Sequence, residues 1–274
     1  MEHRVVKSGG FQLAYKVFGE GTQTVVCLHG HGRSAEDFLF LNNRDVRVIS
    51  IHLFLHDESF IPADRIEKKP LEWPELFPIF EKIFEQEKTD RFHMLAFSQG
   101  GRFAMLLLET IPEKIQSFTL LAPDGLNNNS FYNWSSRRKY MRKLMQGFVE
   151  NPDSIRKWAN VTTQLRLMRP KVNKFVHSFS DDPETFIRAS HTWMAFRNLQ
   201  PDPVKIGSII RKHQITFIII TGVHDQIIQT KSAARFLKKA GLPASCLMEI
   251  ESGHDFFKPA VILKFLPLLP FSKG

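Results

Sequence analysis

The segment from Arg91 to Thr110 constrains the fold more strongly than any other part of the chain. It begins with RFHMLAF, a short apolar run typical of a buried strand, and ends with RFAMLLLET, which has apolar residues at helical spacing. Only Ser98-Gln99-Gly100-Gly101 lies between these two parts, so there is no room for a loop. Ser98 is therefore expected on an abrupt strand-to-helix turn, where a strained backbone exposes its hydroxyl at the edge of a sheet.

Such a turn needs small residues two positions before and after the serine, and Ala96 and Gly100 meet this requirement. The helix that begins at Gln99 would direct its free N–H groups and positive dipole end toward whatever Ser98 attacks. The pattern A-F-S-Q-G thus fits a nucleophile elbow whose usual first glycine is replaced by alanine. Taken alone it is weak evidence, because Ser98 can equally serve only as the cap of the following helix.

Strand-like and helix-like segments alternate on both sides of this turn. A β-hairpin is expected across Gly9-Gly10. Further strands are expected at 24–28, 45–53, 91–97, 117–122, 215–221 and 244–250. Further helices are expected to begin at 34, to cover 71–87, to run from after 203 to about 212, to cover 229–240, and to begin at about 258. This alternation predicts an α/β fold with a mostly parallel sheet and helices on both of its faces.

The segment 125–203 breaks this alternation, since it contains helical patterns and no strand patterns. Asn151-Pro152 and Asp182-Pro183 have the form of helix starts. We therefore expect 1–124 and 204–274 to form the core, and 125–203 to form a helical lid inserted above the carboxyl ends of the strands, where such sheets bind ligands.

The chain has a net charge of +9, and most of this charge lies in the expected lid. Residues 125–203 contain thirteen Lys or Arg and six Asp or Glu, which leaves +7 in the lid, most densely at 137–139 and 142–143. The favoured interpretation is a solvated outer face, and the alternative is attraction of an anionic substrate or a membrane surface. No nucleic-acid-binding pattern is found, so no nucleic-acid partner is expected.

Two cysteines, Cys27 and Cys246, both fall within expected buried strands. They are interpreted as reduced core residues, and no Cys/His cluster has zinc-site spacing. The N-terminal MEHRVVKSGG lacks the apolar stretch of a secretory signal, and no segment is long and apolar enough for stable membrane insertion. These features predict a cytoplasmic protein that needs no cofactor and no metal.

A serine hydroxyl becomes a nucleophile only with a base, usually a histidine that is held by a carboxylate. After an elbow the expected order along the chain is serine, acid, histidine. Asp225 follows the strand 215–221 and His254 follows the strand 244–250, so both should emerge at the same sheet edge as Ser98. Asp124, which follows the strand 117–122, remains a competing candidate for the acid.

The neighbouring polar residues His224 and Asp255 are interpreted as loop groups, and Gly253 is expected to give the loop of His254 freedom to turn. Acyl chemistry also needs donors for an oxyanion. The main-chain N–H groups of Gln99 and of His31, in the loop HGHG, are the expected pair. A metal site is the less favoured interpretation of four histidines, namely His29, His31, His52 and His56.

These motifs together resemble the lidded serine-hydrolase branch of the α/β-hydrolase superfamily. The resemblance rests on HGHGRS at 29–34, AFSQGG at 96–101, GVHD at 222–225 and GH at 253–254, and it covers nearly all of the core but not the lid. It implies an eight-stranded, mostly parallel sheet, a catalytic triad of Ser98, His254 and Asp225, and an oxyanion hole formed by His31 and Gln99.

The expected activity is hydrolysis of a small to medium carboxylic ester or related acyl substrate through an acyl-enzyme. Serine at position 98 argues against the epoxide-hydrolase and haloalkane-dehalogenase branches, which use aspartate there. Carbon–carbon bond hydrolysis, other triad chemistry and a non-enzymatic ligand-binding role remain alternatives. Five aromatic lid residues either line an apolar acyl or aromatic pocket or pack the lid against the core, namely Trp134, Phe148, Trp158, Trp193 and Phe196.

Overall fold

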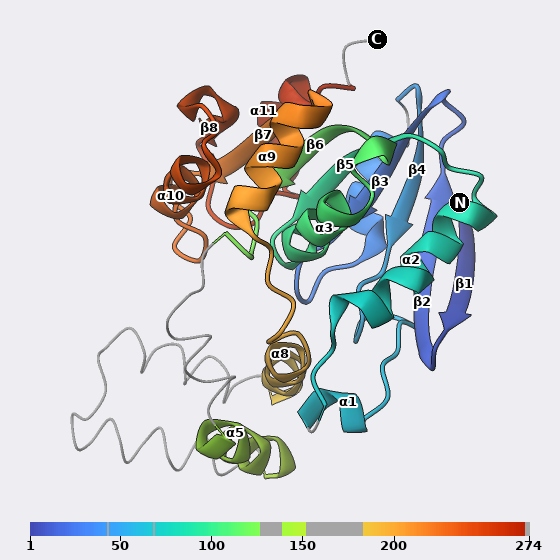
Figure 1. Cartoon of the computed structure of the whole chain (residues 1–274), viewed down its shortest axis with the longest axis vertical. Coiled ribbons are helices and arrows are strands. Elements are labelled where there is room, and N and C mark those ends of the chain that lie inside the picture. Colours follow the sequence, from blue (N-terminus) through green and yellow to red (C-terminus); the bar gives the residue numbers. More distant parts are fainter. Residues whose placement is uncertain (43, 68, 127–138, 152–182, 272–274) are drawn as a thin grey trace. The chain divides into compact units, whose positions relative to one another are not determined.

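The computed structural model describes residues 1–42, 44–67, 69–126, 139–151 and 183–271 (Figure 1). The chain divides into two compact units. The first comprises Met1–Ile61, Glu72–Asn128 and Leu199–Gly274, and the second comprises Pro62–Leu71 and Asn129–Asn198. The first unit contains the whole sheet and every residue expected at the site.

The sheet has eight strands in the order β1-β2-β4-β3-β5-β6-β7-β8. The strands are β1 (Glu2–Ser8), β2 (Phe11–Phe18), β3 (Gln23–Leu28), β4 (Val46–Ile51), β5 (Phe92–Phe97), β6 (Ile115–Leu121), β7 (Thr216–Gly222) and β8 (Leu247–Ile250). β2 pairs antiparallel with β1 and β4, and all other pairs are parallel. The carboxyl ends of β3 and β5 through β8 therefore share one edge of the sheet.

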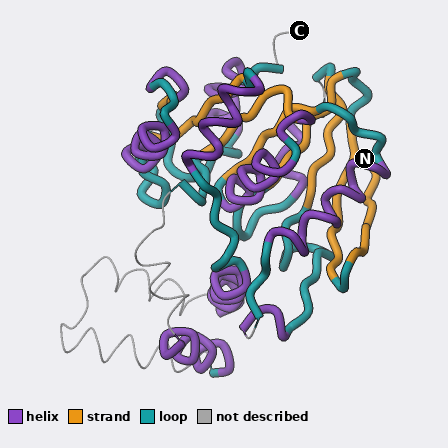
Figure 2. The backbone as a smooth tube through the Cα atoms, in the orientation of Figure 1, coloured by secondary structure: helices purple, strands orange, loops and turns teal. Residues whose placement is uncertain are grey.

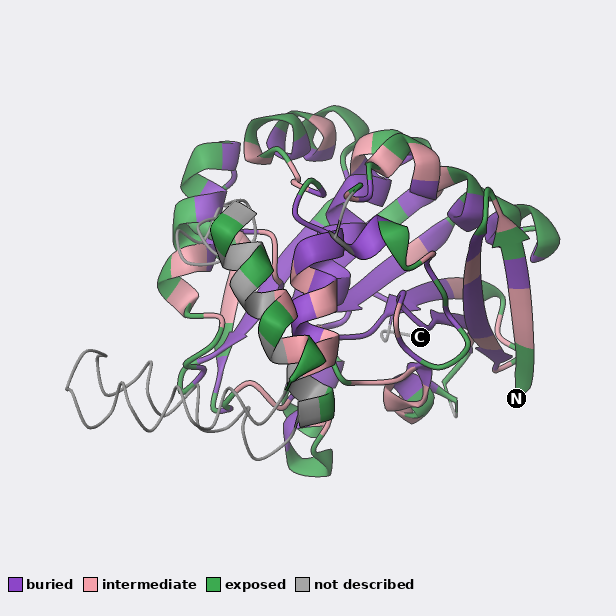
Figure 3. Cartoon of the chain, turned by 90° about the horizontal axis from the view of Figure 1, so that it is seen from below, coloured by how far each residue is buried: buried purple, intermediate pink, exposed green. Residues whose placement is uncertain are grey.

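The composition of the strands follows from their position in the sheet. The central strands are buried along most of their length, whereas the edge strand β1 is largely exposed (Figure 3). Parallel strands that are covered on both faces cannot alternate apolar and polar residues, because both sides of each strand face a core. This explains why FHMLAF and QTVVCL are nearly continuous apolar runs.

Helices cover both faces of the sheet (Figure 2). The helices of the first unit are α2 (Trp73–Gln86), α3 (Gln99–Thr110), α9 (Pro203–His213), α10 (Thr230–Ala240) and α11 (Pro259–Phe265), together with the 3₁₀ helix η1 (Ala35–Leu41). On one face α3 packs on β5, α9 lies beside α3, and α10 lies beside α9. On the other face η1 and α11 contribute to an apolar core.

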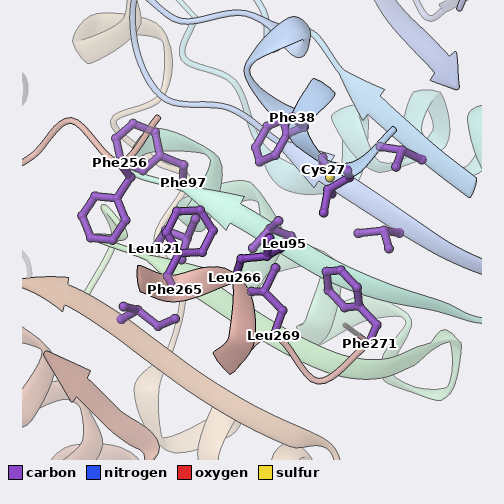
Figure 4. Close-up of a cluster of buried hydrophobic side chains, with 14 of the residues drawn as sticks. Cys27, Phe38, Leu95, Phe97, Leu121, Phe256, Phe265, Leu266, Leu269 and Phe271 are labelled. Atoms are coloured by element: carbon purple, nitrogen blue, oxygen red, sulfur yellow. The ribbon is translucent and has the colours of Figure 1, made fainter. Parts of the chain in front are cut away.

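This core is rich in phenylalanine and lies directly behind the strands that carry the candidate site. Figure 4 shows side chains of β5 and β6 gathered with those of the C-terminal segment, namely Leu95, Phe97, Leu121, Phe265, Leu266 and Leu269. Full burial of one such side chain contributes roughly 1.5–3 kcal/mol to stability. The core therefore fixes the strand β5, whose last residue Phe97 precedes Ser98.

The second unit contains three described helices, α1 (Asp64–Glu67), α5 (Lys139–Glu150) and α8 (Pro183–Ala195). The amide of Leu71 donates to the carbonyl of Ala195 over 2.9 Å, which joins the two segments of this unit. The helix start expected at Asp182-Pro183 matches the first residue of α8, although Asp182 itself lies outside the described residues. The helix start expected at Asn151-Pro152 and the Arg137-Arg138 part of the basic cluster also extend outside them.

The predicted α/β class and eight-stranded sheet are confirmed, and three details differ. The segment after Ser34 is a 3₁₀ helix, and the Ser34 side chain makes no capping hydrogen bond. The strand expected at 244–250 is confined to 247–250, because 244–246 form a 3₁₀ turn. Cys246 is therefore only partly buried in a turn, whereas Cys27 is a buried strand residue, and both are free thiols.

A membrane-spanning helix was not expected, and among the described residues none of the helices is long and apolar enough to cross a bilayer. The role of 125–203 as a lid stays a prediction, because much of this segment lies outside the described residues. Of its five aromatic residues, Phe196 is buried and Trp193 is partly buried. The side chains of Trp134, Phe148 and Trp158 are not described.

Candidate active site

Ser98 lies at the abrupt turn between β5 and α3, with a φ of 47° and a ψ of −115°. A positive φ is uncommon for a residue other than glycine, and such strain costs on the order of 1–3 kcal/mol. Three backbone hydrogen bonds hold this conformation. The Ser98 amide donates to Leu121 over 2.9 Å, and the Ser98 carbonyl accepts from the amides of Gly101 (2.9 Å) and Asp124 (2.7 Å).

The glycines around the turn are required by close packing. A Cβ atom on Gly100 would lie 2.2 Å from the carbonyl oxygen of Leu28, which is main chain and cannot move aside alone. A Cβ on Gly30 would lie 2.7 Å from the ring of Phe97 and 3.1 Å from Cβ of Ser98. The two loops that were expected to supply the nucleophile and an oxyanion donor are thus in direct contact.

His254 and Asp225 lie beside Ser98, on the loops that follow β8 and β7. His254 Nε2 is 3.1 Å from Ser98 Oγ, and His254 Nδ1 is 2.7 Å from Asp225 Oδ2. The other carboxylate oxygen of Asp225 accepts the amides of Ile227 (2.8 Å) and Ile228 (2.9 Å). The Asp225 side chain is fully buried, and the His254 side chain is 22% exposed.

This hydrogen-bond pattern has a defined direction. An ionised carboxylate can only accept hydrogen bonds, so the bond between Asp225 Oδ2 and His254 is assigned to a proton on Nδ1. Nε2 then carries a lone pair and faces the Ser98 hydroxyl. The imidazole also lies against the Phe97 ring, with centroids 5.2 Å apart. In this geometry His254 can accept a proton from Ser98 while Asp225 stabilises the resulting charge.

Asp124, the other candidate for the acid, does not contact His254 and instead pairs with an arginine. Its carboxylate binds the guanidinium of Arg102, with both oxygens within 3.1 Å of Nη2. The flanking residues His224 and Asp255 also have partners outside the triad positions. His224 pairs with Glu251 over 2.9 Å at the surface, and Asp255 lies 3.5 Å from Arg33. Among the described carboxylates, Asp225 is the one in contact with His254.

The loop between β3 and η1 is held by two histidines. His29 Nδ1 donates to the carbonyl of Gly30 over 2.7 Å, and His29 Nε2 accepts the amide of Leu53 over 3.0 Å. His56 Nε2 accepts the amide of Gly32 over 2.9 Å. Desolvation is the main reason that the pKa of His29 lies well below its usual value, so this ring is neutral at pH 7. His29 therefore keeps the tautomer that ties the loop to the residues after β4.

These contacts also bear on the metal alternative. The lone pairs of His29 Nε2 and His56 Nε2 each accept a backbone amide, so neither atom is available as a ligand. Within the described part of the chain, no group of three or more His, Cys, Asp or Glu residues is arranged to hold a metal ion. His31 lies beside His56, with ring centroids 5.6 Å apart.

The two expected oxyanion donors belong to segments that adjoin Ser98. Gln99 is the first residue of α3, so its main-chain N–H has no acceptor within the helix. His31 follows Gly30, whose close approach to Ser98 places the HGHG loop next to that serine. The Gln99 side chain is 8% exposed, and its Oε1 is buried without a hydrogen-bond partner among the described residues.

Two features of the site were not expected from the sequence. His56 anchors the HGHG loop although it is 24 residues away from Gly32. Arg102 joins α3 to Asp124, a pairing that the helical spacing of this segment does not indicate. Gly253 is expected to give the loop of His254 freedom to turn, but in the structure its φ is not positive and a Cβ there would meet nothing within 4 Å, so this conformation does not require glycine.

Known proteins share this fold and parts of this sequence. A segment of 113 residues is 31% identical to a Bacillus subtilis (strain 168) protein named as a 2-succinyl-6-hydroxy-2,4-cyclohexadiene-1-carboxylate synthase. This match covers 39% of the present chain and 40% of that relative, so it spans less than half of either protein.

Solved structures match over nearly the full length. A thermophilic esterase from Thermogutta terrifontis has a TM-score of 0.64 at 14% identity, with 98% of this chain and 99% of that chain covered. The 2-hydroxy-6-oxo-6-phenylhexa-2,4-dienoate hydrolase of Rhodococcus sp. strain RHA1 has a TM-score of 0.64 at 17% identity, with 98% and 96% covered. At these identities the likeness establishes the fold alone.

The family is identified by the sequence itself. The model of the alpha/beta hydrolase fold family matches residues 23–260, a range that begins at β3 and ends within α11. It includes Ser98, Asp225 and His254 in the order expected after a nucleophile elbow. The chain belongs to the alpha/beta hydrolase fold family.

Proposed function

We propose that this protein is a serine hydrolase that cleaves a small to medium carboxylic ester or related acyl substrate with Ser98, His254 and Asp225. The observation that carries the proposal is the continuous contact from a strained serine, through 3.1 Å to an imidazole and through 2.7 Å to a buried carboxylate. A serine that only capped α3 would need neither the strained backbone nor this histidine.

In the first half of the proposed reaction, Ser98 Oγ attacks the substrate carbonyl as His254 Nε2 takes the hydroxyl proton. Negative charge develops on the carbonyl oxygen, and the amides of Gln99 and His31 donate to it. His254 then returns the proton to the leaving group, whose bond to the carbonyl carbon breaks. Asp225 orients the imidazole and stabilises its transient positive charge.

In the second half, water attacks the acyl-enzyme, and His254 accepts its proton. The tetrahedral intermediate collapses, Ser98 recovers its proton from His254, and the carboxylic acid leaves. Asp225 is suited to this work, because its buried carboxylate is held by two amides and does not need to reorganise when the imidazole becomes charged. Preorganisation of this kind is a major source of rate enhancement in enzymes.

A second candidate function is other triad chemistry, such as cleavage of a carbon–carbon bond. It is supported by the match to a relative named as a synthase that makes a cyclohexadiene carboxylate, and by the fold shared with the Rhodococcus phenylhexadienoate hydrolase. A nucleophile and base of the same geometry serve several reactions, and fold does not choose among them. The ester reading is preferred because an elbow serine with a nearby amide donor meets the minimum needs of acyl transfer.

The deciding experiment is labelling of the purified protein by a fluorophosphonate probe, followed by turnover of p-nitrophenyl esters of increasing acyl length. We expect labelling and turnover in the wild type, and loss of both in Ser98→Ala with the thermal unfolding midpoint retained. Labelling without ester turnover would favour the second candidate or a ligand-binding role. Absence of labelling in the folded wild-type protein would show that Ser98 is not an activated nucleophile.

A further inference from the structure

Arg102 is a charged residue in a place where charge is costly. It lies on α3, one turn after Ser98, and is 5% exposed. Its guanidinium donates through Nε and Nη2 to the Asp124 carboxylate over 3.0 and 2.9 Å, and through Nη1 to the carbonyl of Leu199 over 2.6 Å. A buried guanidinium persists only where its donors are satisfied, and here three of its nitrogens have acceptors.

The residue that Arg102 holds is itself bonded to the proposed nucleophile. The main-chain amide of Asp124 donates to the carbonyl of Ser98 over 2.7 Å, the shortest of the three backbone bonds that hold this turn. A strained φ persists only where the surrounding structure over-determines it. The position of the Asp124 backbone is therefore one of the constraints that keep Ser98 in its conformation.

Arg102 also joins two chain segments that are distant in sequence. Asp124 lies just before the chain leaves the first unit, and Leu199 is the residue at which the chain returns to it. The contact between Arg102 and Leu199 spans 97 residues along the sequence. One guanidinium therefore fixes both ends of the insertion at the helix that begins with the residue after Ser98.

From these contacts we propose that Arg102 is a positioning residue for Ser98. It acts through Asp124, whose amide it orients toward the Ser98 carbonyl, and it does not contact the reacting atoms. This inference rests on the proposed function, because it assigns a role relative to the same nucleophile. It also explains why Asp124, a candidate acid by sequence, has its carboxylate committed to an arginine.

The test uses Arg102→Gln and Arg102→Lys in the full-length protein, with Arg211→Gln as a control for the loss of an arginine that bonds main-chain carbonyls. Arg211 also donates to two acceptors, the carbonyls of Ala240 and Gly241 at 2.8 Å each. It lies in the last turn of α9, shortly before β7 begins, and it is exposed. It is therefore at the amino ends of the parallel strands, away from Ser98, and its loss should cost less stability than the loss of the buried Arg102. The readouts are the second-order rate of fluorophosphonate labelling, the thermal unfolding midpoint, and hydrogen exchange in peptides covering 97–104 and 120–126.

We expect Arg102→Gln to lower the labelling rate by about 10- to 100-fold, because small misplacements of reacting atoms have effects of this size. Hydrogen exchange should accelerate in both peptides at temperatures far below unfolding. Arg102→Lys, which keeps the charge, should recover part of both. Arg211→Gln should lower the unfolding midpoint while leaving labelling and exchange at the elbow unchanged.

The inference is overturned if Arg102→Gln leaves exchange at the elbow at the wild-type rate, or if Arg211→Gln slows labelling as much as Arg102→Gln does. Failure of the proposed function has a different signature, since the wild-type protein would then resist labelling. In that case only hydrogen exchange tests the positioning role. Faster hydrogen exchange at 97–104 in Arg102→Gln but not in Arg211→Gln supports that role, and equal exchange in the two variants contradicts it.

Discussion

The two halves of the candidate site are held in place by different forces. The nucleophile half, around Ser98, is fixed by close packing, against main chain at Gly100 and against the side chains of Phe97 and Ser98 at Gly30. The acid–base half, around Asp225 and His254, is fixed by hydrogen bonds from loops that leave open space around Gly253. Substitutions that disturb the close packing around Ser98 should lower the stability of the protein. Isosteric substitutions that change only the hydrogen bonds around Asp225 and His254 should have little effect on the fold.

This difference has a physical reason. A serine with a strained backbone keeps its conformation only if the surrounding atoms cannot move aside, and the main chain of β3 is rigid enough to ensure this. A histidine that gains and loses a proton needs a partner that responds to charge, and a buried carboxylate with two fixed amide donors provides this. We therefore predict that substitutions in the acid–base half lower activity more than stability, and that substitutions of the glycines in the nucleophile half lower stability.

The largest expected effect is on activity, in the acid–base half. Asp225→Asn should lower kcat by about 10³- to 10⁴-fold, since the amide disfavours the Nδ1–H tautomer of His254 and removes the charge that stabilises imidazolium. The unfolding midpoint should change little. Asp124→Asn is the matched control, and we expect it to lower kcat by less than about 10-fold. Equal losses in the two variants would break the assignment of Asp225 as the acid.

The next effect is on stability, in the nucleophile half. Gly100→Ala should destabilise the protein by several kcal/mol, roughly the upper range for single substitutions, because the new Cβ would meet the main chain of Leu28 at 2.2 Å. Gly253→Ala, where a Cβ meets nothing within 4 Å, should change the free energy of unfolding by less than about 0.5 kcal/mol. Chemical denaturation of both variants measures the contrast, and similar values for the two would refute it.

A third prediction concerns the histidines whose pKa values are lowered by desolvation. Burial lowers the pKa of His52 to about 4, below its unfolded value near 6.5, so the unfolded state binds more protons in this range. His52 therefore contributes stability that is present above pH 6.5 and lost as the pH falls toward 4. The buried His29 and the partly buried His93 and His191, whose pKa values are also lowered by desolvation, act in the same direction.

Denaturation at pH 7, 6 and 5 tests this sign. The wild type should lose stability on acidification, and His52→Gln should flatten the profile by at most about 1.4 kcal/mol per pH unit, the limit for one proton. A steeper slope in His52→Gln would contradict the argument.

The smallest effect is expected where the two halves meet. Arg33, in the loop of His31, lies 3.5 Å from Asp255, which follows His254, and its guanidinium sits 4.9 Å from the Phe257 ring centroid. Both side chains are about a third or more exposed, so solvent screens the pair. Asp255→Asn should lower kcat by no more than about threefold, corresponding to the weak energy of exposed ion pairs. If Asp255→Asn lowered kcat nearly as much as Asp225→Asn, Asp255 would have to be counted as part of the acid–base half.

Much of this architecture was readable in the sequence. The elbow followed from a strand pattern and a helix pattern with no loop between them, and the sheet class followed from their alternation. The common edge of Ser98, Asp225 and His254 followed from the rule that parallel strands end at one edge. These inferences succeed because they depend on local periodicity and on chain order, which the sequence contains directly.

The tertiary structure decided what depends on contacts between distant segments. Asp124 and Asp225 both follow strands and are equivalent by local pattern, and they differ because one meets Arg102 and the other meets His254. The anchoring of the HGHG loop by His56, and the strict need for glycine at 100 but not at 253, have the same origin. Sequence patterns specify which side chains reach an edge, whereas partner choice depends on packing in three dimensions, where a few ångströms separate one partner from another.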